Sequence, residues 1–261
     1  MSPAFELTNR DGKPIGDLRA WKRLASPGER RWKKGRSAQE LARSWLSEHG
    51  PEALGNLLNH RPELASFAIR SGVAEARTTF DDFGGPRNHD LLLSGEAEGG
   101  QTVVAVEGKV DETFGPTLAG RRDEARRRIA RKENTNLPER LRGLTMSIAG
   151  WEAGAAASRL ELRYQLFTAV AGTLAAAVDA QAEQAVFCIH ELITDGIDEK
   201  NRKRNEDDMK RFLDVVFGAY VKGDDDPSWI VGPFRAHGGS ERVPSGIPFY
   251  IAKLSTPAAS G

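Results

Sequence analysis

The sequence predicts an α/β protein in which a mixed central sheet is flanked by helices. Amphipathic helical segments, a hairpin-like pair of apolar runs and further strands follow one another in the order expected when helices cover such a sheet. The 261 residues are 39% hydrophobic, which suits one large folded core rather than a disordered chain. We expect a single domain over residues 37–254, preceded by a basic arm or lead-in (1–36) and followed by a flexible tail (255–261).

Helices are expected first. The lead-in mixes glycine, proline and isolated tryptophans without a sustained period, which is typical of irregular structure. A helix should begin at Ser37, because Ser37 and Glu40 have the spacing of a capping box, and Gly50 and Pro51 should end it. Two further short helices are expected, over 54–58 and 62–69.

Strands are expected from the middle of the chain onward. The apolar runs 90–93 and 102–106 flank a turn-rich stretch and predict a β-hairpin with a long tip, and 77–80 is a weaker strand candidate. In a later helix, the helical period places Tyr220 on the buried face with Met209 and Phe212. The elements after the hairpin are expected to be helices over 118–132, 159–178 and 205–220 and strands over 185–189, 229–234 and 247–254.

The charges of the chain balance overall, with 37 basic and 37 acidic residues, but they are unevenly spread. Residues 10–36 hold ten Lys/Arg against three Asp/Glu, and residues 121–142 hold nine against four, giving net charges of +7 and +5. Basic zones of this kind suit a polyanionic partner, although charge runs are more often only solvated surface.

The cellular setting follows from cysteine use and from the apolar runs. The single cysteine, Cys188, excludes an intrachain disulfide and a cysteine-rich zinc site, and it indicates a reducing compartment. The N-terminus lacks the apolar core of a secretion signal, and the longest apolar run, 166–178, is too short to cross a bilayer. We therefore expect a soluble, cytoplasmic protein without a membrane partner.

The residues that carry chemistry lie on the predicted hairpin. Side chains alternate between the two faces of a strand, so Glu107 and Lys109 share one face. If Ser94 pairs with Val103, antiparallel pairing places Asp90 opposite Glu107. Directly opposed Cβ atoms lie about 4.5 to 5.5 Å apart, a separation at which two carboxylates can share one divalent cation. Oxygen ligands with no soft ligand nearby favour magnesium or manganese.

This arrangement resembles the PD-(D/E)XK superfamily of restriction-endonuclease-like nucleases. In that motif an acidic residue begins one strand and Glu-x-Lys lies on the next, and Asp90, Glu107 and Lys109 match these positions. His89 stands where the motif name has proline, a position without a chemical role in the family. The stretch 107–115, with Asn-His-Asp upstream and Tyr-Gln-Leu downstream, is similar more narrowly to an uncharacterised bacterial group of the same superfamily.

The resemblance covers about residues 37–192 and implies a restriction-endonuclease-like fold and a metal-dependent endonuclease acting on DNA. It implies that Asp90 and Glu107 hold Mg²⁺ and that Lys109 assists the attacking water. Glu40 resembles the helical acid that many members add to the metal site, although capping explains it without a metal. Gln165 resembles a polar helical residue that faces the site in members of the superfamily, and a solvated position is as compatible with the sequence.

Nucleic-acid contacts are expected from the helix that follows the motif. Its basic side chains could lie along a phosphate backbone. They are Arg121, Arg122, Arg126, Arg127, Arg128 and Lys132.

Two other functions stay open at this point. A catalytically silent nuclease fold could bind nucleic acid or a protein, and an unrelated pair of carboxylates could serve a glycosidase. The intact motif argues against the first, and the lysine two residues after Glu107 argues against the second. A homodimer is one way to cut both strands, but no segment of the sequence identifies an interface.

Overall fold

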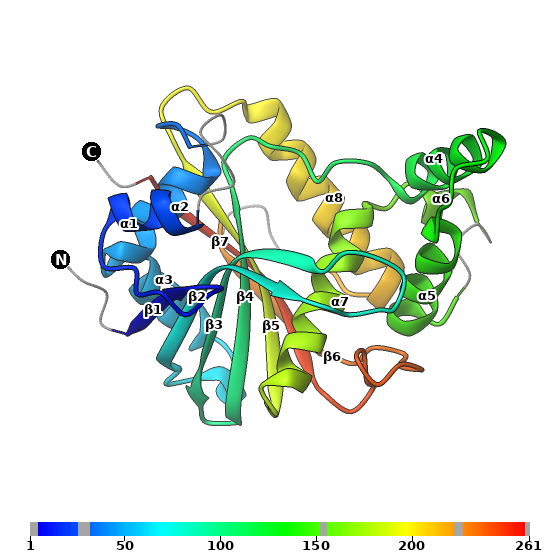
Figure 1. Cartoon of the computed structure of the whole chain (residues 1–261). Coiled ribbons are helices and arrows are strands. Elements are labelled where there is room, and N and C mark those ends of the chain that lie inside the picture. The colour runs from blue at the N-terminus through cyan, green and yellow to red at the C-terminus, as the bar shows by residue number, and fades with distance from the viewer. Residues whose placement is uncertain (1–4, 26–31, 152–155, 222–226, 259–261) are drawn as a thin grey trace.

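The described residues form a mixed sheet of seven strands. The computed structural model describes residues 5–25, 32–151, 156–221 and 227–258. Its strands lie in the order β1-β2-β3-β4-β5-β7-β6, with antiparallel pairs β2/β3, β3/β4 and β6/β7 and parallel pairs elsewhere (Figure 1). The strands are β1 (Glu6–Asn9), β2 (Ala68–Thr78), β3 (Arg87–Ala97), β4 (Gly100–Lys109), β5 (Gln184–Ile193), β6 (Trp229–Phe234) and β7 (Phe249–Pro257).

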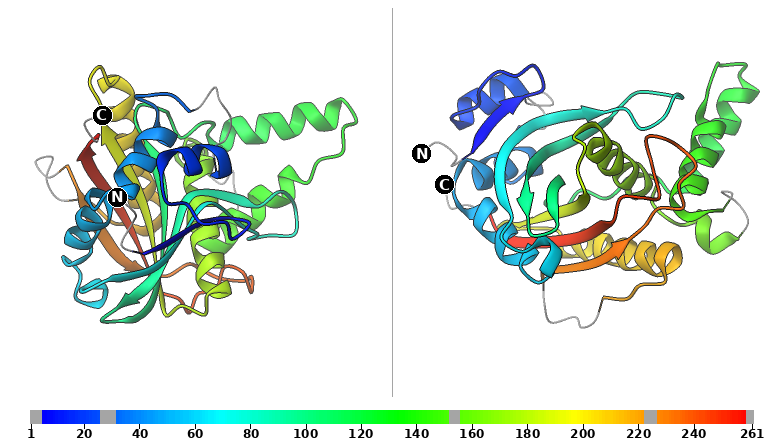
Figure 2. Two further views of the ribbon diagram at one scale, coloured as in Figure 1. Left: turned by 60° about the vertical axis from the view of Figure 1, so that its left-hand side comes forward. Right: turned by 90° about the horizontal axis from the view of Figure 1, so that it is seen from below.

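Helices cover both faces of this sheet, as the sequence predicts. Helices α1 (Leu18–Ala25), α2 (Ser37–Leu46) and α3 (His49–Leu58) pack on one face, and α5 (Leu137–Ala149), α7 (Tyr164–Asp179) and α8 (Glu199–Phe217) pack on the other. Helix α4 (Leu118–Ala130) and the short α6 (Ala157–Leu160) lie farther out, and α4 projects from the body of the molecule (Figure 2). No helix in the described part of the chain is long and apolar enough to span a membrane.

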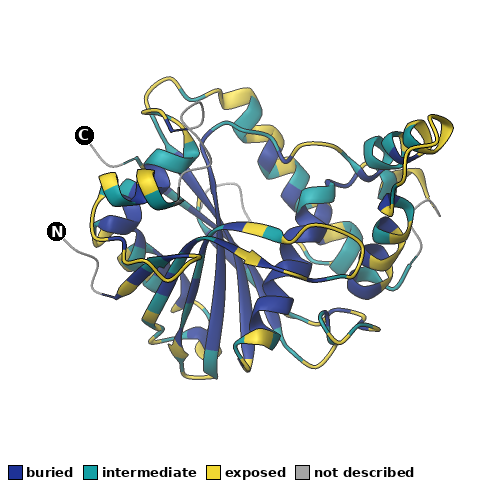
Figure 3. Cartoon of the chain, in the orientation of Figure 1, coloured by how far each residue is buried: buried dark blue, intermediate teal, exposed yellow. Residues whose placement is uncertain are grey.

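Strand β4 lies at the centre of the sheet and is covered on both sides. Val103 belongs to the hydrophobic cluster shared with α7, whereas Val104 and Val106 belong to the cluster shared with α2 and α3. Burial on both faces explains why this strand reads as a continuous apolar run (Figure 3). The same alternation sends Glu107 and Lys109 toward α7.

The N-terminal segment is part of the domain rather than a free arm. Strand β1 pairs in parallel with β2, and Trp21 and Trp32 are only 2% and 8% exposed. The basic side chains that the structure describes in this segment are exposed, while the tryptophans pack in the core with α2. At the other end, β7 continues to Pro257, so the expected tail begins later than residue 255; residues 259–261 lie outside the described part.

Several predicted boundaries are wrong for identifiable reasons. The hairpin arms run on to Ala97 and Gly100, leaving a two-residue turn because Gly100 adopts a φ of 101°. Gly50 and Pro51 begin helix α3 instead of ending α2, since proline is tolerated in the first turn of a helix. The expected helix over 62–69 is a single 3-10 turn, Pro62–Leu64, followed by β2.

Two helix predictions also fail in part. The helix expected over 159–178 is broken between α6 and α7, where Arg163 bonds Asp208 (2.7 Å) and the Gly115 carbonyl (2.7 Å). Tyr220 is 74% exposed, because Gly218 ends α8 in the left-handed conformation before Tyr220 is reached.

Burial of His190 in β5 predicts a pH-dependent stability. Trp45 Nε1 donates to His190 Nδ1 (3.2 Å), and His190 Nε2 bonds Thr256 Oγ1 (2.8 Å). Burial lowers the pKa of His190 from 6.5 to about 3. Between about pH 3 and pH 6.5 the unfolded chain binds a proton at His190 that the folded chain does not. The free energy of unfolding is therefore at its full value above pH 6.5 and falls as the pH is lowered through this range.

We expect the unfolding free energy of the wild type to fall more steeply from about pH 6 to about pH 4 than that of His190→Gln, by up to about 1.4 kcal/mol per pH unit. Urea unfolding at several pH values measures both slopes. The control is His60→Gln, at an exposed histidine, which should keep the wild-type slope. Equal slopes in the wild type and His190→Gln would contradict the lowered pKa of His190 in the folded protein.

Candidate active site

The predicted register of the hairpin is confirmed. Ser94 pairs with Val103, and the next steps along the same register set Asp90 opposite Glu107. Asp90, Glu107 and Lys109 line one cleft of about 700 Å³, together with Gln165 from the first turn of α7. The sheet and α7 therefore bring the motif residues into a single cavity.

Glu107 is the most heavily engaged carboxylate of this cleft. Its Oε1 accepts hydrogen bonds from Lys109 Nζ (3.0 Å) and Gln165 Nε2 (2.6 Å), and Arg87 forms an ion pair with Oε2. Burial opposes the ionisation of Glu107, but the charges of Arg87 and Lys109 outweigh it and hold the pKa of Glu107 at about 2. Glu107 is therefore an anion at neutral pH.

Asp90 lies in the opposite electrostatic environment. Its Oδ2 accepts a hydrogen bond from the Gly108 backbone N–H (2.8 Å). Burial, and then the carboxylates of Glu107 and Glu75, raise the pKa of Asp90 to about 8. Asp90 is therefore largely protonated at neutral pH, and a cation bound beside it would favour its ionised form.

Glu75 is a third carboxylate of the cleft, and the sequence reasoning missed it. It falls opposite Asp90 in the register of β2 with β3, and its φ of 54° is rare for a residue with a side chain. Such strain is concentrated at functional sites. The sequence of β2 lacks the large apolar residues that indicate a strand, because buried positions on it hold the small residues Gly72, Ala74 and Ala76.

Arg87, which was also missed, reaches Glu107 because α7 leaves room for it. A Cβ at Gly172 of α7 would lie 2.7 Å from Arg87 Cγ and 3.0 Å from His89 Cε1. Both contacts are too short, so glycine is required where α7 crosses the start of β3. A glycine inside an apolar helix is the sequence signal that indicates such close packing.

The start of α2 is tied to the end of the motif strand. Ser37 Oγ donates to Glu112 Oε1 (3.0 Å), and Arg36 forms an ion pair with Asp111 (3.2 Å). Arg36, Ser37 and Glu112 also line the cleft. The N-terminal segment therefore contributes one wall of the cavity.

Glu40 lies apart from the described residues that line the cleft. It is buried, and its Oε1 accepts a hydrogen bond from the Gly35 backbone N–H (2.7 Å). The predicted capping box is wrong, because the N-cap is Arg36 and no side chain caps the helix there. Glu40 instead braces the turn that precedes α2.

The basic residues expected to contact nucleic acid divide between different surfaces of the α4 region. Arg121 and Arg128 line one pocket, and Arg122 and Arg126 line a second, more apolar one between α4 and α5. Those that are exposed and line neither pocket are Arg127 and Lys132.

The donor set of the cleft fits a hard divalent cation. Asp90, Glu107 and Glu75 offer carboxylate oxygens, and the described residues that line the cavity include no cysteine or histidine. No group of three or more His, Cys, Asp or Glu side chains poised to hold a metal occurs in the described part of the chain. A cation would therefore have to displace Arg87 from Glu107 Oε2 and draw the carboxylates together.

A family model described as a domain of unknown function (DUF6946) matches residues 14–258. The chain belongs to this family. The DUF6946 match includes every residue that lines the cleft and most of the N-terminal segment, in keeping with the packing of that segment on the domain. No curated protein and no solved structure matches the chain.

Metal binding at the cleft can be tested by thermal denaturation. Millimolar Mg²⁺ or Mn²⁺ should raise the melting temperature of the wild type, because an ion that binds only the folded state stabilises it. Asp90→Asn should remove most of this rise, since the substitution deletes one anionic ligand.

The control for this experiment is Asp111→Asn, at the end of the same hairpin. Asp111 pairs with Arg36 and does not line the cleft, so this variant should keep the rise. A rise of the same size in all three proteins would place the ion elsewhere.

Proposed function

We propose that this protein is a metal-dependent nuclease that hydrolyses phosphodiester bonds, with DNA as its substrate and the cytoplasm as its place of action. The observation that supports the proposal is the convergence of Asp90, Glu107 and Lys109 on one cleft, with one carboxylate ionised and the other electrostatically strained. Metal-dependent hydrolysis of a phosphodiester needs carboxylates that bind the ion and a positive charge near the reacting groups.

Each residue has a role that follows from its environment. Asp90 and Glu107 would hold a divalent ion, which would supply an activated water and offset charge on the phosphate. Lys109 holds its ammonium beside Glu107 and positions the attacking water while opposing the negative charge that develops in the transition state. Gln165 orients Glu107 from α7. Arg87 also lines the cleft, and its guanidinium would neutralise a non-bridging phosphate oxygen if it left Glu107.

Lys109→Met should lower the rate of Mg²⁺-dependent DNA cleavage by at least about a hundredfold, the usual loss when a preorganised charged donor is removed. The melting temperature should change little, because Glu107 keeps Arg87 and Gln165 as partners. Cleavage of linear and plasmid DNA with Mg²⁺, Mn²⁺ or EDTA provides the measurement.

The matched control is Lys253→Met, at the other buried lysine of the sheet. Lys253 pairs with Glu191 (3.2 Å) and Glu206 (2.8 Å), and none of the three lines the cleft, so its loss should lower the melting temperature but not the cleavage rate at a temperature where the variant is folded. If Lys109→Met cleaves at the wild-type rate, the mechanism is wrong. If the wild type binds DNA but never cleaves it, the silent nuclease fold is the better description.

A further inference from the structure

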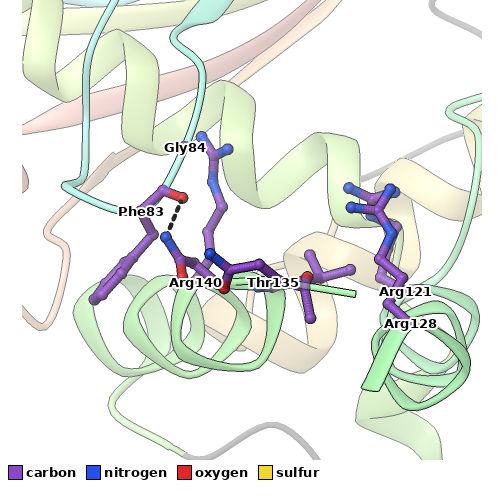
Figure 4. Close-up of a pocket in the computed structure, with 9 residues that line it drawn as sticks. Phe83, Gly84, Arg121, Arg128, Thr135 and Arg140 are labelled. Atoms are coloured by element: carbon purple, nitrogen blue, oxygen red, sulfur yellow. Dashed lines mark hydrogen bonds between the residues drawn. The ribbon is translucent and has the colours of Figure 1, made fainter. Parts of the chain in front are cut away.

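A second polar pocket lies beside the cleft, between α4, the start of α5 and the loop that joins β2 to β3. Its volume is about 310 Å³, at the lower end of the range for small-molecule sites. Figure 4 shows Arg121 and Arg128 together on one side, Arg140 reaching up beside Gly84 on the other, and Thr135 between them. We call this cavity the arginine pocket.

The charges around the arginine pocket favour a single negative charge. Nine of the described residues line it, and these include three arginines and no acidic side chain. Glu124 pairs with both Arg121 and Arg128, and Asp81 pairs with Arg140 (2.9 Å), so these two nearby acids offset two of the three positive charges. One positive charge is left over, which matches one phosphodiester group.

The arginines are also held in place before any ligand arrives. Arg121 lies over the Tyr164 ring (4.8 Å to the centroid), and Arg140 lies over the Phe80 ring (4.6 Å). Buried Arg121 Nε has no hydrogen-bond partner among the described residues. Phe83, 39% exposed at the rim, offers an apolar surface for a sugar or base.

Two short connections join the arginine pocket to the cleft. Tyr164, which packs against Arg121, is followed directly by Gln165, which bonds Glu107. Gly84 of the pocket lies three residues before Arg87 of the cleft, and such a stretch spans at most about 11 Å. A DNA strand advances about 3.4 Å per nucleotide along the helix axis, so the backbones of these two lining residues are separated by no more than the length of about three nucleotides.

We propose that the arginine pocket holds a phosphate of the same nucleic-acid strand whose scissile bond lies in the cleft. The inference rests on the proposed function and adds which of the basic residues bind the strand: Arg121, Arg128 and Arg140, not Arg122, Arg126 or Arg127. The phosphate is an internal phosphodiester or a terminal 5′-phosphate, which share the same recognition chemistry.

Binding measured without cleavage tests this proposal. Fluorescence anisotropy of labelled single-stranded and duplex DNA in EDTA, at several salt concentrations, gives both affinity and salt slope for the full chain. Arg128→Gln should weaken binding about tenfold, the loss of one charge-assisted hydrogen bond, and should flatten the slope of log affinity against log salt by about 0.9.

Two further variants separate a specific pocket from general electrostatics. Arg127→Gln removes the same charge one residue away, on a side chain that lines neither cavity, and should leave the affinity within about twofold. Gly84→Ala removes no charge, but its Cβ would meet the Arg140 guanidinium, and it should weaken binding because Arg140 must move.

The outcomes differ for the inference and for the proposed function. Equal effects of Arg127→Gln and Arg128→Gln, or no effect of Arg128→Gln on DNA that the wild type binds, overturns the arginine pocket and leaves the nuclease proposal standing. DNA that is bound through Arg128 but never cleaved with Mg²⁺ overturns only the nuclease. A chain that binds no DNA overturns both. Tighter binding of 5′-phosphorylated than of 5′-hydroxyl strands identifies a terminal phosphate, and equal binding identifies an internal one.

Discussion

The buried carboxylate of Glu107 is the constraint on which the rest of the site depends. Strand β4 lies in the middle of the sheet, so a side chain at this position is largely shielded from bulk water and stays ionised because the protein supplies cations and donors. These come from three elements: Lys109 on the same strand, Arg87 on β3 and Gln165 on α7. A buried charge left without compensation costs about 3 to 5 kcal/mol, so the ionised Glu107 favours keeping β3 and α7 close to β4.

Two other features of the cleft lower the stability of the folded protein. Burial, and then two neighbouring carboxylates, raise the pKa of Asp90, and Glu75 adopts a backbone conformation that costs about 1 to 3 kcal/mol in a residue with a side chain. Neither feature helps to hold the sheet together. Asp90 and Glu75 both place carboxyl groups in the same cavity, so a cation that binds there would offset part of this destabilisation. A site selected only for stability would not contain this arrangement.

The sequence was sufficient for the register of the hairpin, although not for its short turn, and insufficient for the residues that surround it. Alternation and one pairing assumption predicted that Asp90 faces Glu107, because strand register depends on local period. Arg87 and Glu75 could not be found in this way, since their roles depend on how α7 and β2 pack across the sheet. The break before α7 also depends on tertiary contacts. Arg163 lies at this break and bonds Asp208 and a backbone carbonyl, both distant in sequence. Local patterns carry no information on such tertiary partners.

The first turn of α7 connects the two polar cavities through consecutive residues. Successive side chains on a helix point in directions about 100° apart, so Tyr164 can support Arg121 while Gln165 supports Glu107. A strand held in both cavities would therefore be fixed against one rigid element, without a flexible loop between its two anchor points. Contacts of this kind are made to phosphates and carry no base information. Any preference for sequence would have to come from the shape of the strand between the cavities or from residues beyond them.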